Sequence, residues 1–172
     1  MKFDKIFLIG FMGCGKSTFG KKLAEKIGWN YIDLDNYIES KEVKSIPTIF
    51  QENGEKYFRN IESKFLKELM SLNSYVISCG GGTPCFHNNM ELILEKGASV
   101  YMKVSPYILH ERLKLEKAKR PLISEMTDSQ MFIFIQNKLN ERANYYELSK
   151  FTFQNELESE ETFINRINDF LI

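Results

Sequence analysis

The fold is decided by the stretch Lys5-Ile-Phe-Leu-Ile-Gly10-Phe-Met-Gly13-Cys14-Gly15-Lys16-Ser17-Thr18, near the start of the 172-residue chain. Its apolar run, residues 6–9, predicts a short buried strand, and a helical pattern begins after Gly15. Gly10, four further residues and then Gly15-Lys16-Ser17 match the spacing of a phosphate-binding loop. A strand, a glycine-rich turn and a helix in this order predict that the chain binds a nucleoside triphosphate.

The spacing of this loop has a physical reason. A loop that wraps a phosphate points successive backbone N–H groups inward, and side chains obstruct both the required backbone angles and the close approach. The helix that follows directs its unpaired N–H groups and positive dipole end at the anion. Lys16 adds a cation for the outer phosphates, and the Ser17 hydroxyl can ligate Mg²⁺. A glycine turn that merely happens to carry a lysine is the alternative, and the complete strand–loop–helix context argues against it.

The composition restricts the other classes of protein. The 23 basic and 23 acidic residues balance, which argues against a nucleic-acid or membrane partner. Three cysteines without a framework spacing (Cys14, Cys79 and Cys85) favour a reduced, cytoplasmic setting. Cys79, Cys85 and His87 lack the fourth ligand and the paired spacing of a zinc site. We find no signal sequence and no stretch of transmembrane length.

Short apolar runs alternate with helical patterns along the whole chain. Strands are expected at residues 6–9, 29–33, 75–78, 99–104 and 151–153, and helices at about 17–26, 36–40, 46–72 (interrupted near Asn53-Gly54), 88–96, 106–113, 131–148 and 159–171. This alternation predicts an α/β fold with a parallel sheet covered on both faces. Residues 114–128 are rich in charge and show no sustained periodicity, and no linker divides the chain, so one domain spanning 1–172 is expected.

Ligands of such sheets bind beyond the carboxyl ends of the strands, so Gly10, Asp33 and Gly80 are expected to line one crevice. In Asp33-Leu34-Asp35, one carboxylate suits Mg²⁺ and the other suits a hydroxyl nucleophile that must be oriented or deprotonated. The alternative for this pair is structural, with Asp35 capping a helix that begins near Asn36.

A second glycine-rich segment, Ser78-Cys79-Gly80-Gly81-Gly82, follows the third predicted strand. It suits a site where a ligand meets bare backbone, and a flexible turn is the alternative. Ser78 would lie close enough to reach a metal-bound water.

Four arginines have a possible role beside these loops. Arg59 and Arg142 would select an anionic substrate if both faced one pocket, because guanidinium grips a carboxylate in a bidentate manner. Arg120, in the charged stretch, suits a closing lid that neutralises transferred phosphate, and Arg112 could lie against a nucleotide base. Taken singly, an arginine in any of these positions is most often an ordinary surface residue.

Taken together, the motifs resemble the shikimate kinase family over nearly the whole chain. The resemblance rests on Gly10-Phe-Met-Gly-Cys-Gly-Lys-Ser-Thr18, Asp33-Leu-Asp35, Ser45-Ile-Pro-Thr-Ile-Phe50, Gly54-Glu-Lys-Tyr-Phe-Arg59, Gly80-Gly-Gly82, Arg120-Pro-Leu122, and Arg142 followed by Tyr146. It implies a three-layer P-loop fold of the nucleoside-monophosphate-kinase type, with a five-stranded parallel sheet, a shikimate-binding region near 33–62 and a mobile lid near 112–124. It also implies transfer of the γ-phosphate of ATP to the 3-hydroxyl of shikimate by a monomeric, Mg²⁺-dependent enzyme.

The same resemblance implies a role for each matching residue. Those expected at the nucleotide are Gly13, Cys14, Gly15, Lys16, Ser17, Thr18, Arg112 and Arg120. Those expected at shikimate are Asp35, Phe50, Phe58, Arg59, Gly80, Gly81, Gly82 and Arg142. Ser17 and Asp33 would serve Mg²⁺, and Lys16, Asp35 and Arg120 would be catalytic, with Asp35 either removing the hydroxyl proton or only positioning the hydroxyl.

The chain departs from the family pattern at Cys14, at Thr48 and after Arg142, where Ala143-Asn144 lacks the usual proline. Two rival functions are another small-metabolite kinase, such as a gluconate kinase, and a non-catalytic nucleotide-binding regulator. The first has less need of two carboxylate-gripping arginines, and the second would not need Asp35, Arg59 or the lid arginine.

Overall fold

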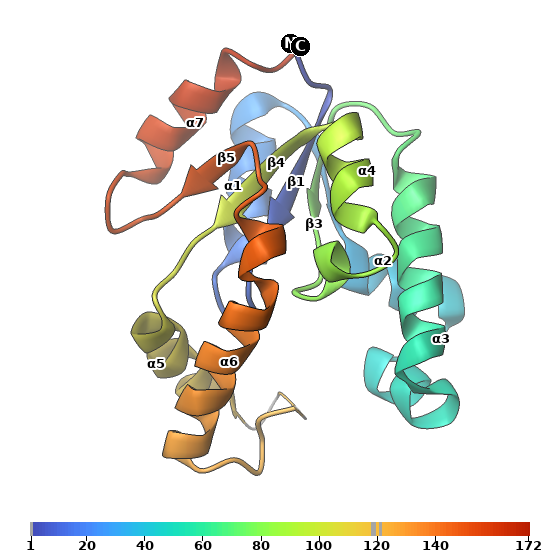
Figure 1. Cartoon of the computed structure of the whole chain (residues 1–172). Helices are drawn as coiled ribbons and strands as arrows, with labels where there is room; N and C mark the ends of the chain where they lie inside the picture. Colours follow the sequence, from blue (N-terminus) through green and yellow to red (C-terminus); the bar gives the residue numbers. More distant parts are fainter. Residues whose placement is uncertain (1, 118–119, 121) are drawn as a thin grey trace.

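The computed structural model describes residues 2–117, 120 and 122–172, and its centre is a five-stranded, wholly parallel sheet (Figure 1). The strand order is β2-β3-β1-β4-β5. The strands are β1 (Lys5–Ile9), β2 (Asn30–Asp33), β3 (Tyr75–Ser78), β4 (Ala98–Met102) and β5 (Phe151–Phe153). The helices are α1 (Lys16–Ile27), α2 (Leu34–Glu42), α3 (Ile46–Leu69), the 3₁₀ helix η1 (Thr83–Cys85), α4 (Asn89–Lys96), α5 (Pro106–Glu116), α6 (Asp128–Tyr146) and α7 (Glu160–Asn168).

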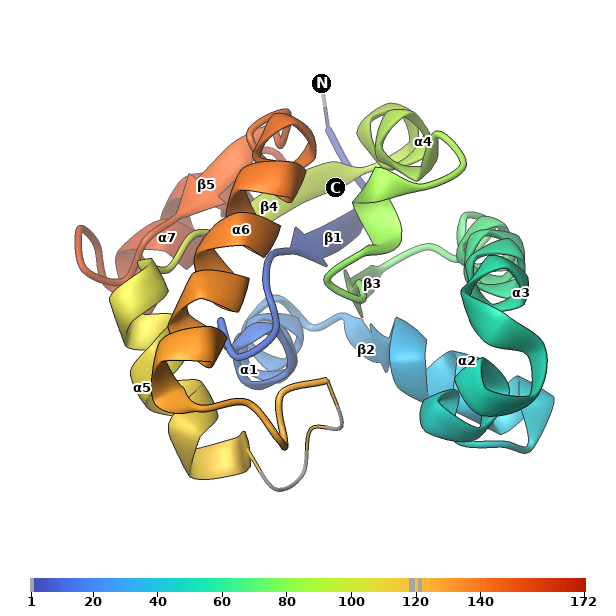
Figure 2. The same ribbon diagram turned by 60° about the horizontal axis from the view of Figure 1, so that its bottom comes forward.

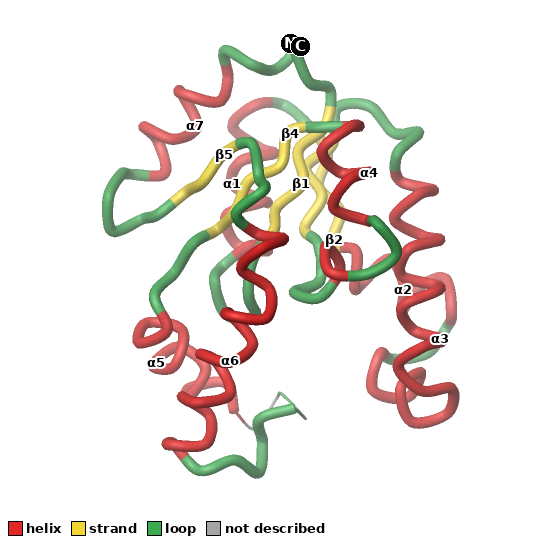
Figure 3. The backbone as a smooth tube through the Cα atoms, viewed as in Figure 1, coloured by secondary structure: helices red, strands yellow, loops and turns green. Residues whose placement is uncertain are grey.

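Alternation along the central strand divides the core between the two faces of the sheet. Ile6 and Leu8 pack with α1, α5 and α7, whereas Phe7 and Ile9 pack with α2, α3, α4 and the end of α6. Helices therefore lie on both sides of the strands, which Figure 3 shows as yellow strands between red helices. A β-strand directs successive side chains to opposite faces, so an uninterrupted apolar run fits only a strand buried on both faces. The predicted three-layer α/β fold is confirmed.

Several predicted boundaries are confirmed together with their causes. Helix α1 begins after Gly15 and ends at Gly28, whose φ of 71° lets its N–H bond back to the carbonyl of Ala24. The predicted interruption of the long helix lies at Gly54, where φ is 78° and ψ is 173°. Ser159 accepts from the N–H of Thr162 and caps α7, as expected.

Other boundaries differ from the prediction. Helix α2 begins at Leu34, and its cap is Asp33, which accepts from the N–H groups of Asp35 and Asn36. The suggestion that Asp35 is the capping residue was therefore wrong. Helix α6 begins at Asp128 rather than Met131, because Thr127 and Gln130 form a capping box that apolar periodicity does not reveal.

The remaining differences are shifts of element ends. Helix α5 continues to Glu116, and β4 runs over Ala98–Met102 instead of 99–104. Helix α7 ends at Asn168, after which Leu171 pairs with Phe3. Pro121 of the Arg-Pro-Leu motif and part of the predicted lid, residues 118 and 119, lie outside the described residues. None of the helices described here has the length and apolar character needed to cross a bilayer.

All strands point in one direction, so their carboxyl ends meet at one edge, which Figure 2 presents to the viewer. The loop after β1 lies there between two groups of helices, α5 and α6 on one side and α2 and α3 on the other. Residues separated by more than a hundred positions are thereby brought to one cleft.

Candidate active site

The loop between β1 and α1 has the backbone shape of an anion-binding turn. Gly10, Gly13 and Gly15 have φ values of 149°, 78° and 97°, which residues other than glycine rarely adopt. A Cβ at Gly10 would lie 2.9 Å from the carbonyl oxygen of Met102. Both backbone angle and space therefore require glycine here. The amino end of the 12-residue helix α1 follows at once, which makes the loop suitable for a phosphate.

Lys16 is the first residue of α1, and its side chain folds back over the loop. Its ammonium donates to the carbonyl oxygens of Gly10 at 2.8 Å and Phe11 at 3.1 Å. These contacts hold the cation at the loop, where a phosphate chain would meet it. Cys14 and Thr18, two of the residues predicted at the nucleotide, line the surrounding cavities.

Ser17 and Asp33 form the candidate metal site, with the Ser17 hydroxyl donating to Oδ2 of Asp33 at 2.9 Å. Tyr31 approaches the same carboxylate oxygen at 3.3 Å and the hydroxyl of Ser78 at 3.0 Å. Ser78 is buried behind Tyr31. Among the described residues, no group of three or more His, Cys, Asp or Glu could hold a metal ion. A hydroxyl and one carboxylate fit Mg²⁺, which keeps waters and takes its other ligands from phosphates.

Asp35 lies in the first turn of α2, half-buried and two residues from Asp33. Burial raises the pKa of its carboxyl from 3.8 to about 6, and the charges of Asp33 and Glu62 act in the same direction, whereas Lys16 opposes them. A carboxyl with a pKa near neutrality is suited to accept the proton of a hydroxyl group.

The three consecutive glycines form a tight turn after β3, closed by the N–H of Thr83 on the carbonyl of Gly80 at 3.1 Å. Their φ values lie outside the left-handed region, so the backbone angles do not demand glycine. The glycines instead leave room for the ends of three side chains: a Cβ at Gly80 would lie 2.9 Å from Asp35, one at Gly81 3.1 Å from Arg142 and one at Gly82 2.8 Å from Arg59. The turn therefore presents bare backbone to three of the predicted site residues, Asp35, Arg59 and Arg142.

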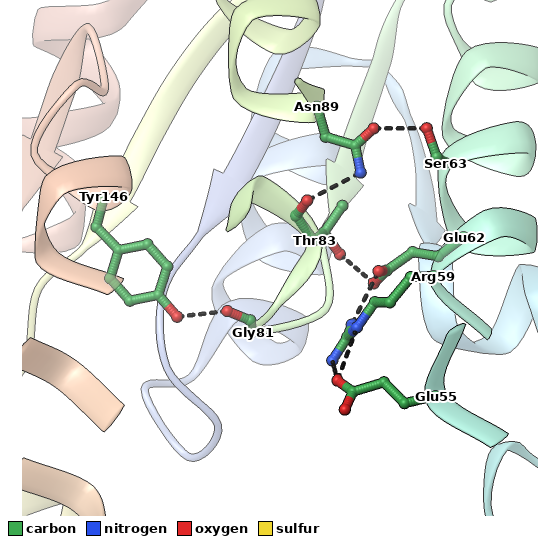
Figure 4. A network of polar contacts seen from close by, with 8 residues as sticks. All are labelled: Glu55, Arg59, Glu62, Ser63, Gly81, Thr83, Asn89 and Tyr146. Atoms are coloured by element: carbon green, nitrogen blue, oxygen red, sulfur yellow. Dashed lines mark hydrogen bonds and ion pairs between the residues drawn. The ribbon is translucent and has the colours of Figure 1, made fainter. Parts of the chain in front are cut away.

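Arg59 is held by carboxylates on its own helix, α3. It donates to Glu62 at 2.9 Å and to Glu55 at 3.1 and 3.2 Å, and its guanidinium lies over the ring of Phe86. Glu62 is only 1 % exposed and also accepts from the hydroxyl of Thr83 at 2.6 Å. Figure 4 shows this network beside the glycine turn. The buried carboxylate therefore fixes the orientation of Arg59.

Arg142 reaches the glycine turn from α6, whereas Arg59 reaches it from α3. The guanidinium of Arg142 lies 5.5 Å from the centre of the Phe11 ring. It shares one cavity of about 380 Å³ with Arg59 and the glycine turn. Phe50 and Phe58 form one wall of that cavity, with their ring centroids 4.6 Å apart. The structure therefore brings together both predicted arginines and both predicted aromatic residues.

A second cavity, of about 390 Å³, lies at the other end of the loop between Gly13 and Phe153. Arg112 borders it and donates to the carbonyl of Gly13 at 3.4 Å. Arg120 lies instead above the phosphate region, where its Nε and Nη2 donate to Glu116 at 3.1 and 2.5 Å.

The two cavities are joined by a third, of about 290 Å³, over the phosphate loop. It shares Gly13, Gly15 and Thr18 with the first. It shares Asp35 and Arg120 with the cavity of the two arginines. The cleft is thus continuous from one end to the other, with Asp35 and Arg120 at the junction. Such a cleft can hold a nucleotide and a second anionic molecule in line.

Sequence reasoning missed several residues of this cleft. Glu62, Thr83 and Asn89 support Arg59 from behind, with Asn89 linking the hydroxyl of Ser63 to the carbonyl of Thr83. The sequence did contain a signal for Glu62: both Glu62 and Ser63 occupy positions on the buried, otherwise apolar face of α3. Tyr31 beside Asp33 carried no such signal.

Comparison with known proteins agrees with this geometry. Residues 12–172 match the family model for shikimate kinase. The shikimate kinase of Parabacteroides distasonis is 40 % identical over 168 residues, covering 98 % of this chain and 97 % of the relative. The crystal structure of shikimate kinase from Bacteroides thetaiotaomicron superposes with a TM-score of 0.89 at 38 % identity and covers 96 % of both chains.

A further structure is the shikimate kinase from Acinetobacter baumannii in complex with shikimate. Its TM-score is 0.84 at 31 % identity, and the match covers 97 % of this chain and 92 % of that one. Matches of this extent, in sequence and in structure, show that the chain belongs to the shikimate kinase family of ATP-dependent kinases.

Proposed function

We propose that the continuous cleft transfers the γ-phosphate of ATP to the 3-hydroxyl of shikimate, giving shikimate 3-phosphate and ADP. The observation that carries the assignment of roles is the junction of the cleft. There Asp35 and Arg120 border both the phosphate region and the cavity that contains Arg59 and Arg142. The reaction is the one that names the family, and a related enzyme has been crystallised with shikimate.

The acceptor side of the cleft suits a small molecule with one carboxylate and several hydroxyls. Arg59 and Arg142 would grip the carboxylate, because two planar guanidinium groups face one cavity. The aromatic wall of Phe50 and Phe58 would pack on the ring of shikimate. Asp35 and the backbone of the glycine turn would bind its hydroxyls. The region 33–62 would then supply Asp35, Phe50, Phe58 and Arg59 to the acceptor site.

The donor side would bind ATP through the phosphate loop, Lys16 and Thr18, with the base beside Arg112. Ser17 and Asp33 would hold Mg²⁺, which neutralises phosphate charge when it is bound. Lys16 and Arg120 would stabilise charge on the transferring group, and Asp35 would orient the hydroxyl and accept its proton. We propose that residues 112–124 act as a lid, because Arg112 and Arg120 both border the cleft.

We also propose that the enzyme acts as a monomer in the cytoplasm. The residues assigned to the cleft all come from one chain, and its three cysteines are free.

The test measures ADP release with shikimate and, separately, with gluconate as acceptor. We expect turnover with shikimate alone. Arg59→Ala should raise the KM for shikimate by about 30-fold, because a charge-assisted grip contributes on the order of 2 kcal/mol. The KM for ATP serves as the internal control and should stay the same.

Two outcomes would contradict the proposal. Turnover with gluconate but not shikimate would assign the cleft to the rival metabolite kinase. ATP binding without any shikimate-dependent phosphate transfer would indicate a nucleotide-binding regulator.

A further inference from the structure

Tyr146 is a buried phenol at the last position of α6, and its hydroxyl donates to the carbonyl oxygen of Gly81 at 2.5 Å. Its ring packs on that of Tyr101, with centroids 5.2 Å apart. Burial raises the pKa of Tyr146 above its usual value, although the nearby charge of Arg142 opposes this shift. The phenol therefore keeps its proton at neutral pH, and a carbonyl oxygen can only accept it.

This hydrogen bond restricts the peptide between Gly81 and Gly82. These are the two central residues of the turn closed by Gly80 and Thr83, and Gly82 has the φ of −94° and ψ of −16° expected at the third position of a type I turn. In a planar trans peptide the C=O and the following N–H point in opposite directions. Because the Gly81 carbonyl points at Tyr146, the N–H of Gly82 points away from it.

The direction away from Tyr146 leads into the acceptor cavity. Figure 4 shows Tyr146 and Arg59 on opposite sides of the glycine turn. A Cβ at Gly82 would lie 2.8 Å from the Arg59 guanidinium, and both residues line the cavity. Within the described residues, the N–H of Gly82 has no hydrogen-bond acceptor. A donor beside an anion-binding arginine, without a partner of its own, is available to a ligand.

Helix α6 contacts this turn at two positions one turn apart. Arg142 lies four residues before Tyr146, and its Nη1 lies 3.1 Å from the position of a Cβ at Gly81. Residues four apart share one face of a helix, so the same face of α6 holds Gly81 by its carbonyl and packs against its Cα. Without the hydroxyl, the peptide would lose the hydrogen bond that fixes its carbonyl, in a run of glycines whose backbone has the widest conformational freedom.

We propose that Tyr146 is a positioning residue, whose hydroxyl holds the Gly81–Gly82 peptide so that the Gly82 N–H is presented to an oxygen atom of the bound acceptor. This inference rests on the proposed function, since it adds a residue to the shikimate site.

The first test is Tyr146→Phe, which removes only the hydroxyl. We expect the KM for shikimate to rise about fivefold, the effect of one neutral hydrogen bond, with an unchanged KM for ATP. The matched control is Tyr101→Phe, because Tyr101 packs on the same ring but its hydroxyl makes no hydrogen bond within the described residues. That variant should retain wild-type kinetics. An unchanged shikimate KM in Tyr146→Phe, or equal rises in both KM values, would overturn the proposal.

The second test follows the Gly82 amide by NMR in ¹⁵N-glycine-labelled enzyme. On addition of shikimate we expect its proton resonance to move downfield in the wild type and to move less in Tyr146→Phe. A wild-type Gly82 resonance that does not respond at saturating shikimate would overturn the proposal, even if the variant fails to fold. Failure of the proposed function would be seen separately, because the wild-type enzyme would then not turn over shikimate at all.

Discussion

Two glycine-rich segments follow neighbouring strands of this sheet, and they use glycine for different reasons. In the phosphate loop, Gly13 and Gly15 have left-handed φ values, so the backbone itself requires glycine. In the turn after β3, Gly81 and Gly82 have ordinary backbone angles, and glycine leaves room there for the guanidinium groups of Arg142 and Arg59, which lie 3.1 and 2.8 Å from the positions of a Cβ. In the first segment glycine allows the backbone angles of the loop, and in the second it leaves space for side chains from other helices.

This difference explains why one half of the cleft is encoded by a continuous sequence motif and the other half by residues that lie far apart in the sequence. A loop that binds through its own backbone concentrates its requirements in one stretch, here Gly10 to Ser17. A turn that serves as a platform depends on residues from separate helices, here Asp35, Arg59 and Arg142. Its function is therefore spread over more than a hundred positions.

The largest expected effect separates chemistry from acceptor binding. Lys16→Ala removes the cation held over the phosphate loop, and we expect kcat to fall about 10³-fold, the loss typical of one group that stabilises transition-state charge. The KM for shikimate should change little, because Lys16 does not line the cavity of the two arginines. Steady-state kinetics with both substrates varied would measure this.

Lys22→Ala is the matched control for this variant. Lys22 lies on the same helix, is exposed and pairs with Glu160 at 3.1 Å, so its removal should leave kcat unchanged. A Lys16→Ala enzyme whose main defect is a higher shikimate KM would show that the two regions are not separate in function.

A smaller effect tests the two uses of glycine directly. Gly82→Ala should raise the KM for shikimate about tenfold with little loss of stability, because the new Cβ displaces Arg59 but its φ of −94° is unstrained. Gly13→Ala should instead lower Tm and raise the KM for ATP, because a φ of 78° costs a side chain about 1–2 kcal/mol. Kinetics and thermal unfolding of both variants give the comparison.

Gly28→Ala provides the control for strain alone. Its φ is 71°, and nothing lies within 4 Å of the position of its Cβ. It should lower Tm without changing either KM. If Gly82→Ala instead resembled Gly28→Ala, the turn would need glycine for its backbone, and the contrast between the two segments would be lost.

The sequence was sufficient to predict the architecture and the position of the phosphate-binding loop motif between β1 and α1. Apolar runs such as residues 6–9 can be satisfied only by strands covered on both faces, and the loop motif lies in one piece. Arg59 and Arg142 could be nominated but not placed, because their convergence depends on how α3 and α6 pack around the sheet. Glu62 and Tyr146 act through contacts made after folding, with Arg59 and with the Gly81 carbonyl, and no motif encodes such contacts.

The smallest expected effect concerns Asp35, where the two halves of the cleft meet. Burial, with the neighbouring charges of Asp33 and Glu62, raises the pKa of this carboxyl from 3.8 to about 6. Below about pH 3 the group is protonated in both the folded and the unfolded state, so it does not affect stability. As the pH rises from about 3 to 6, the unfolded chain ionises first, and the folded enzyme loses stability.

Asp35→Asn, which stays neutral, should therefore be more stable than the wild type at pH 7.5 by about 1–2 kcal/mol, a value reduced from the full shift because the side chain is half-buried. The difference should become negligible at pH 3, where the carboxyl is protonated in the unfolded chain as well. Urea unfolding at both pH values measures it, with the exposed Asp128→Asn as control: the pKa of Asp128 is lowered by Lys114, so that variant should gain no stability. Equal stability of Asp35→Asn and wild type at pH 7.5 would mean that the folded enzyme does not raise the pKa of Asp35. The junction of the cleft would then lack a carboxylate suited to accept the proton of the acceptor hydroxyl.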